Sequence, residues 1–132
     1  MTGIAGVLDT VLRDGAVRHE QIETVMIGTT QFTNAIIQRR ELSEVAAIRM
    51  ALPSGNGLPP MVDWPADIAE AMGGHSYMLR GGYLYDGRPL AELDDDAIDA
   101  VIADIIARKL KHIAIASAFS PMNAEPERYL AR

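Results

Sequence analysis

The chain has 132 residues and carries 12 Lys and Arg against 18 Asp and Glu, for a formal net charge of −6 at pH 7. This length is typical of one domain with its own hydrophobic core. Because the sequence contains no cysteine, disulfide scaffolds, cysteine-bound zinc sites and thiol nucleophiles are excluded. The acidic balance argues against nucleic acid as a partner, since such binding depends on neutralising phosphates. No apolar run approaches the roughly 20 residues of a membrane-spanning helix, so we expect a cytoplasmic protein without a membrane partner.

The amino-terminal part of the chain predicts a helix followed by a strand. Apolar residues recur at helical spacing over residues 4–12. Arg13 and Gly15 then provide the cation and the glycine that are typical of a helix end. The short apolar run at residues 24–27 indicates a buried strand, which ends at Gly28.

A second helix, a second strand and a long loop are expected next. Thr29 or Thr30 can cap the helix, which runs to about residue 40. Residues 43–51 are apolar enough for another buried strand. Residues 52–62 contain the longest stretch rich in proline and glycine and therefore predict a loop.

The middle of the chain predicts a short helix and a β-ribbon. Pro65 is typical of the first turn of a helix. Residues 75–90 are rich in aromatics and glycines, and Asp86 followed by Gly87 is a strong hairpin signal. We therefore expect a β-ribbon over 75–90, with a bend or bulge at Gly81 and Gly82.

The carboxyl-terminal part gives the clearest pattern. Acidic residues 94–96 precede apolar residues at helical spacing over 98–106, which predicts a helix with acids at the positive end of its dipole. Residues 113–116 are uninterruptedly apolar, as in a strand covered on both faces. A loop at 117–123 and a final helix over 125–130 follow.

Three apolar strands that alternate with amphipathic helices predict an α/β fold with a mainly parallel sheet, flanking helices and a β-hairpin. The first helix begins almost at Met1 without a strand before it, and the last one stops at Arg132. We therefore expect residues 1–132 to form a single domain with both ends cut, as a fragment of a longer protein.

The junction from the first predicted strand into the second helix is one candidate site. Free backbone N–H groups make a helix start a natural anion site, and Thr29 and Thr30 add hydroxyl donors. Gly28 permits close approach of a ligand to the backbone, and Asn34 lies one helical turn beyond Thr30. The alternative is that a threonine simply caps the helix and that Asn34 is solvated.

A second candidate junction follows the last predicted strand, where Ser120 and Asn123 lie in the loop 117–123. Ligands of parallel α/β sheets gather beyond the carboxyl ends of the strands, so the two junctions are expected to share one cleft. The alternative is that Ser120 or Asn123 caps the last helix. His19, His75 and His112 lack metal-ligand spacing, so no metal site is expected. These patterns define a fold and a cleft but no reaction.

Residues 25–39 read VMIGTTQFTNAIIQR. They closely resemble the Gly-Thr-Thr-x-x-x-Asn-Ala segment of the amino-terminal domain of the hydantoinase/oxoprolinase family, of the hydantoinase A type. Further stretches follow in the family's order, including the loop that ends in Pro-Pro-Met-Val-Asp-Trp-Pro at 59–65 and Phe-Ser-Pro-Met-Asn at 119–123 with Glu127 beyond it. The resemblance covers essentially the whole chain.

The resemblance implies an actin-like ATPase fold (ribonuclease H-like) and an enzyme that uses ATP and Mg²⁺ to open cyclic amides such as hydantoins or 5-oxoproline. It implies phosphorylation of the amide oxygen, which makes the ring a better electrophile for water. A hydantoinase B type subunit is an implied partner. Acetone carboxylase subunits are relatives, so the substrate is not fixed.

The sequence lacks the Asp-x-Gly-x-Thr hairpin that the family is expected to use for phosphates and Mg²⁺. We therefore expect the fragment itself to be inactive and to bind no cofactor, with its catalytic residues unknown. In the parent enzyme, Gly28, Thr29, Thr30 and Asn34 are expected to line the substrate or phosphate cleft. The rival interpretation is a non-catalytic α/β module for protein association. A cut sheet leaves unpaired edges, so we also expect self-association of the fragment.

Overall fold

The computed structural model describes residues 2–15, 18–22 and 30–132, and the chain divides into two compact units, residues 1–31 and 32–132. In the first unit, α1 (Thr2–Asp14) is followed by a single 3₁₀ turn, η1 (His19–Gln21). The N–H of Gly15 donates to the carbonyl of Val11 at 2.9 Å, which ends α1 as its sequence predicts. The strand predicted at 24–27 lies outside the described residues.

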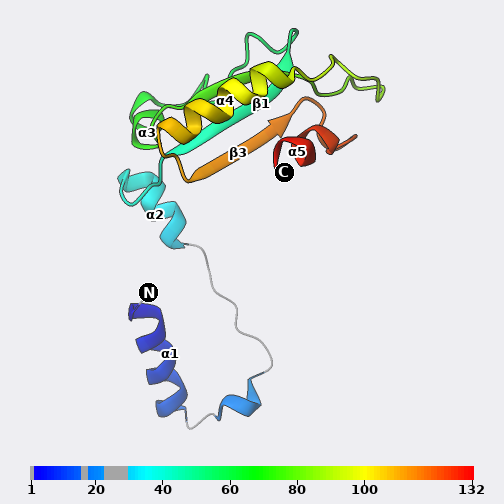
Figure 1. Ribbon diagram of the computed structural model, residues 1–132. Coiled ribbons are helices and arrows are strands. Elements are labelled where there is room, and N and C mark those ends of the chain that lie inside the picture. Colours follow the sequence, from blue (N-terminus) through cyan, green and yellow to red (C-terminus); the bar gives the residue numbers. More distant parts are fainter. Residues whose placement is uncertain (1, 16–17, 23–29) are drawn as a thin grey trace. The chain divides into compact units, whose positions relative to one another are not determined.

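A three-stranded parallel sheet forms the centre of the second unit (Figure 1). Its strands are β1 (Val45–Leu52), β2 (Ser76–Arg80) and β3 (His112–Ser117), in the order β2-β1-β3. Both neighbours run parallel to β1. The predicted α/β class with a parallel sheet is confirmed. Because the strands are parallel, their carboxyl ends share one edge of the sheet.

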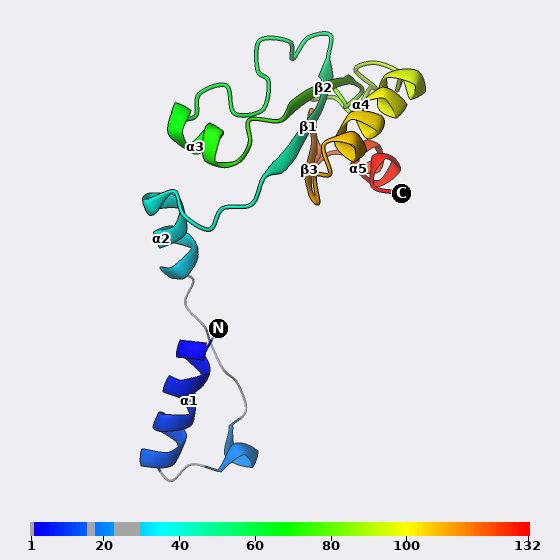
Figure 2. The ribbon, with the colours of Figure 1, turned by 60° about the vertical axis from the view of Figure 1, so that its left-hand side comes forward.

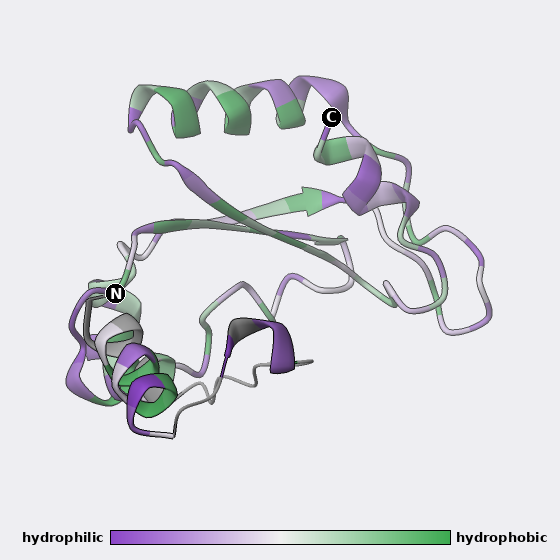
Figure 3. Ribbon diagram, turned by 90° about the horizontal axis from the view of Figure 1, so that it is seen from below, coloured by the Kyte–Doolittle hydropathy of each residue, from purple (hydrophilic) through white to green (hydrophobic). Residues whose placement is uncertain are grey.

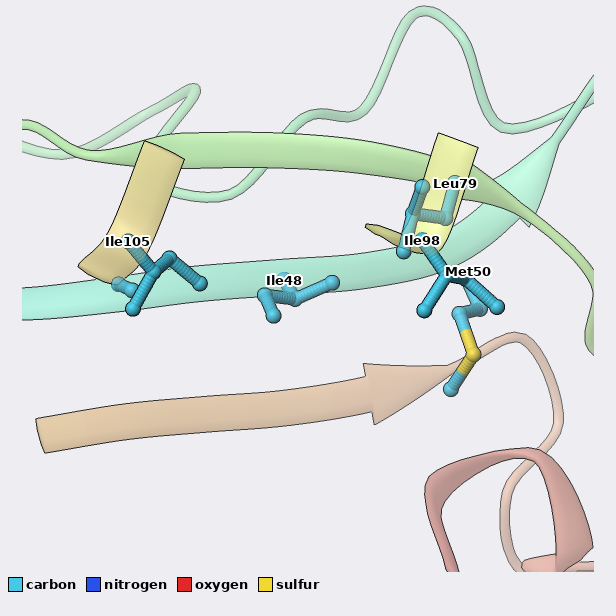
Figure 4. Close-up of a cluster of buried hydrophobic side chains, with 6 residues drawn as sticks. Ile48, Met50, Leu79, Ile98 and Ile105 are labelled. Atoms are coloured by element: carbon cyan, nitrogen blue, oxygen red, sulfur yellow. The ribbon is translucent and has the colours of Figure 1, made fainter. Parts of the chain in front are cut away.

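One face of the sheet is covered by α4 (Asp95–Ala107), which lies along it in Figure 3 with hydrophobic and hydrophilic residues alternating. Asp94 caps this helix, because its Oδ1 accepts the N–H of Ala97 at 3.0 Å. Alternate residues of β1 point toward α4. The resulting core, shown in Figure 4, contains Ala46, Ile48, Met50, Leu79, Ile98 and Ile105.

A polar cluster joins α4 to β2 beside this core. The hydroxyl of Tyr77 donates to Oδ2 of Asp104 at 2.7 Å, and Nε of Arg108 donates to the same oxygen at 2.7 Å. Arg108, and then Tyr77, hold the pKa of Asp104 below its usual value. Asp104 is therefore ionised at neutral pH, and one carboxylate holds both partners.

The loop 53–65 and α3 (Ala66–Ala71) lie on the other side of the sheet from α4 (Figure 2). Arg49 of β1 points to this side, and its Nη1 donates to the carbonyl of Leu58 at 3.0 Å. Ahead of β1, α2 (Thr30–Gln38) ends at Arg39. Nε of Arg39 lies 2.8 Å from Oδ2 of Asp67.

The β-ribbon predicted over 75–90 is wrong in its first half. Ser76–Arg80 is a strand of the parallel sheet, where Leu79 is buried against α4. The turn at Asp86 and Gly87 is confirmed, with one antiparallel bridge between Tyr83 and Pro89, and the chain also bends at Gly81 and Gly82 as predicted. A turn signal predicts where the chain reverses direction, but it does not predict which strands the flanking residues pair with.

The expectation that residues 113–116 are covered on both faces is also wrong. Ile113 is 52% exposed, and Ala114 and Ala116 are exposed as well. β3 is an edge strand, and the core places α4 over β1 and β2. An uninterrupted run of apolar residues therefore predicts that a strand is present, but not which of its faces other elements cover. Within the described ranges, no helix is long and apolar enough to cross a membrane.

Candidate functional site

The segment after β2 crosses the carboxyl ends of the strands. Gly81 and Gly82 have φ of 128° and 90°, which turns the chain over the end of β1. The N–H of Tyr83 then donates to the carbonyl of Ala118 at 2.9 Å, and the N–H of Ala118 donates to the carbonyl of Met50 at 2.9 Å. A Cβ on Gly82 would lie 2.9 Å from that Met50 oxygen. The carboxyl edge is thus closely packed at this point.

The loop 117–123 starts at the same edge. Because Ala118 donates toward β1, the N–H of the preceding Ser117 points away from β1, to the outer side of β3. There it donates to Oε1 of Glu127 at 3.0 Å. Glu127 belongs to α5 (Glu125–Leu130), which lies at the end of β3 (Figure 1). The Glu127 carboxylate thus accepts a hydrogen bond from the last backbone N–H on the outer edge of β3, an edge that is otherwise open.

The pair Ser117 and Glu127 also holds two polar atoms with unused hydrogen-bonding capacity. Oγ of Ser117 and Oε2 of Glu127 are buried and have no hydrogen-bond partner within the described part of the chain. Buried polar groups are normally paired. Two buried hydrogen-bonding groups at the carboxyl edge are therefore left unused by the described residues.

The two predicted residues of this loop have different surroundings. Oδ1 of Asn123 accepts the N–H of Glu125, the first residue of α5, at 2.9 Å. The N-cap of α5 is Ala124, which makes no side-chain cap hydrogen bond, so neither Ser120 nor Asn123 is the helix cap that the alternative predicts. Ser120 is half-buried. Between β3 and these residues, Phe119 has a φ of 54° and is 50% exposed.

The first predicted junction is described only in part. Gly28 and Thr29 lie outside the described residues. Thr30 begins α2, although its side chain is outside the description, and Asn34 is exposed on the same helix. The cleft shared by Gly28–Thr30 and the loop 117–123 therefore stays a prediction.

Two hollows open at the carboxyl side of the sheet, one on each side of the start of α4. The first, of about 480 Å³, lies where β1 and β2 end and includes Asp94. Arg80, Asn56 and the apolar Leu79 also line it. This is where ligands bind in parallel α/β sheets.

The second hollow, of about 650 Å³, lies between the 82–95 segment and α5. Arg128 and Tyr129 of α5 line it together with Asp95 and Glu92. The hydroxyl of Tyr129 donates to Oδ1 of Asp95 at 2.9 Å, and this hydrogen bond to a carboxylate raises the pKa of Tyr129. The contact joins α5 to the first turn of α4.

Arg80, Asn56 and Glu127 belong to the carboxyl edge, and the sequence patterns did not identify a role for them. Arg80 ends β2, so recognising this segment as a parallel strand would have pointed to it. Glu127 carries no local signal, because its partner is the backbone of Ser117. In the part of the chain that the structure describes, no three His, Asp or Glu side chains gather closely enough to hold a metal ion.

Parallel strands joined by helices define an α/β class of protein, in which the carboxyl ends of the strands are the usual place for a ligand. A family model for the hydantoinase/oxoprolinase N-terminal region matches residues 1–132. The chain therefore belongs to this family, and the resemblance carried by residues 25–39 is confirmed. No curated protein and no solved structure matches the chain.

Proposed function

We propose that residues 1–132 form part of the amino-terminal region of an ATP-dependent enzyme that opens cyclic amides of the hydantoin or 5-oxoproline type. Membership of the hydantoinase/oxoprolinase family carries this proposal. The parallel sheet, whose strand ends border two hollows, is an arrangement suited to binding a small molecule.

The proposed role of this chain is to bind and orient the ring. Gly28, Thr29, Thr30 and Asn34, together with Ser120 and Asn123, line the substrate or phosphate cleft. Backbone N–H groups and hydroxyls at a helix start suit an anion or a polarised carbonyl oxygen. Arg80 and Asn56 add donors where β1 and β2 end. Asp94 is less available, because it already accepts from Ala97.

In this proposal, the parent enzyme uses ATP and Mg²⁺. The described residues do not fit a Mg²⁺ site, since no suitable cluster of acids or histidines exists in the ranges 2–15, 18–22 and 30–132. In this proposal, the Mg²⁺ ligands and most contacts to ATP therefore come from other parts of the parent enzyme. The parent enzyme is also proposed to have the actin-like fold. Residues 1–132 alone neither bind ATP well nor turn over. A hydantoinase B type subunit is the proposed partner, and the cytoplasm is the proposed compartment.

A non-catalytic α/β interaction module is the second candidate function. The observation in its favour is the open side of the sheet, where Ile113 on the edge strand is 52% exposed. Exposed edge strands commonly pair with other chains. The family membership favours the enzyme.

The two candidates differ in one assay. The protein that carries residues 1–132 is incubated with hydantoin or 5-oxoproline, with and without ATP, and ring-opened product and ADP are measured together. We expect ring opening only with ATP, and ADP formed in step with product. A folded protein that opens no cyclic amide under either condition would support the interaction module instead.

A further inference from the structure

Phe119, in the loop that follows β3, has a backbone conformation that is costly for an aromatic residue. Its φ is 54°, a value that glycine and asparagine adopt far more readily. Arg39 and Lys109 also have positive φ, but each follows the end of a helix, where a left-handed residue is common. Phe119 comes shortly after the end of a strand instead. A helix end therefore does not explain its conformation.

Backbone hydrogen bonds hold this conformation from both sides. Ahead of Phe119, the N–H of Ala118 donates to the carbonyl of Met50 at 2.9 Å. The carbonyl of Ala118 accepts the N–H of Tyr83, also at 2.9 Å. After Phe119, the N–H of Met122 donates to the carbonyl of Phe119 at 2.8 Å. Backbone strain of this kind persists only where the surroundings fix it, and it is concentrated at functional sites.

The core does not explain why an aromatic side chain stands at position 119. The side chain of Phe119 is 50% exposed. Among the described residues, those that pack against the buried core cluster do not include Phe119. Glycine or asparagine would adopt the same backbone at lower cost. A phenylalanine at this position therefore points to a contact of its exposed ring with a bound molecule.

We propose that the ring of Phe119 stacks on the flat amide face of the cyclic amide in the parent enzyme, an inference that rests on the proposed function. Phe119 lies beyond the carboxyl end of β3, where ligands of parallel α/β sheets bind. It also precedes Ser120, which the proposed function places in the cleft. Hydantoin and 5-oxoproline are small rings that contain a planar amide group, and aromatic side chains favour offset stacking on such groups. Phe119 thus binds the ring by its flat face, whereas the polar groups of the cleft bind its edge.

Steady-state kinetics of ring opening by the parent enzyme tests this contact. We expect Phe119→Asn to raise KM for the cyclic amide by about tenfold or more, the scale of losing one stacked ring, and to leave KM for ATP unchanged. Phe119→Tyr retains the aromatic face and should keep KM near its original value. Tyr85→Asn is the matched control, because Tyr85 is an aromatic residue that is 76% exposed in the hairpin turn. It should leave both KM values unchanged.

Urea denaturation of the 132-residue chain, followed by circular dichroism, separates binding from folding. Because asparagine tolerates a positive φ better than phenylalanine does, the urea midpoint of Phe119→Asn should stay the same or rise. An unchanged KM for Phe119→Asn would overturn the proposal. So would a rise in KM that occurs equally in Phe119→Tyr, or one accompanied by a fall in the urea midpoint. If the parent enzyme opens no cyclic amide, the proposed function itself is refuted, and this contact with it.

Discussion

Ile105→Ala is expected to lower the free energy of unfolding by about 2–5 kcal/mol, the usual cost of a large cavity in a packed core. Ile105 is 4% exposed and belongs to the buried cluster that joins α4 to β1 and β2. Removing part of its side chain leaves a cavity between the helix and the sheet. Urea denaturation followed by circular dichroism at dilute protein concentration measures the change.

Ile106→Ala is the matched control for this substitution. The two residues are adjacent in α4 and chemically identical, but Ile106 is 69% exposed. Its truncation should change the stability of the monomer by less than about 0.5 kcal/mol, as for most surface substitutions. Equal losses for the two variants would mean that α4 does not present Ile105 to the sheet.

Gly82→Ala should also destabilise the fold strongly, by roughly 2 kcal/mol or more. A positive φ of 90° costs an alanine about 1–2 kcal/mol. In addition, the new Cβ would lie 2.9 Å from the carbonyl oxygen of Met50 and 3.0 Å from the nitrogen of Ala118. Both are backbone atoms at the carboxyl edge, so the clash is relieved only if the strand ends move apart.

Gly87→Ala separates the conformational cost of a positive φ from the cost of the steric clash. Gly87 has a φ of 83°, but a Cβ there would meet nothing within 4 Å. Its substitution should therefore show the conformational cost alone and a smaller loss of stability in the same urea experiment. If Gly82→Ala is no worse than Gly87→Ala, the segment after β2 does not pack against Met50 and Ala118 as described.

The part of the fold that was predicted best is α4. Its helical spacing, its acidic first turn and the basic residues that follow it all indicate one structure, and Asp94 caps it. β2 was not predicted, because the hairpin signal at Asp86 and Gly87 led us to assign the preceding residues to a β-ribbon. Their pairing with β1 is a long-range contact, which local patterns do not contain.

The candidate site was predicted in outline only. The rule that ligands gather at the carboxyl ends of parallel strands placed Ser120 and Asn123 at the correct edge. It did not reveal that Asn123 accepts the N–H of Glu125 beside the N-cap Ala124. The contact of Glu127 with the N–H of Ser117 was also missed, because it depends on how α5 packs at the end of β3.

The central proposal is that Gly28, Thr29 and Thr30 line the cleft in which the parent enzyme opens a cyclic amide. Its most direct test is kcat/KM for ATP-dependent ring opening by the parent enzyme with Thr29→Ala, compared with Thr33→Ala, which removes an exposed hydroxyl from α2. We expect Thr29→Ala to lower kcat/KM by about tenfold or more, a loss of about 1.4 kcal/mol of transition-state stabilisation, while Thr33→Ala leaves it unchanged. An unchanged value for Thr29→Ala would contradict the proposal.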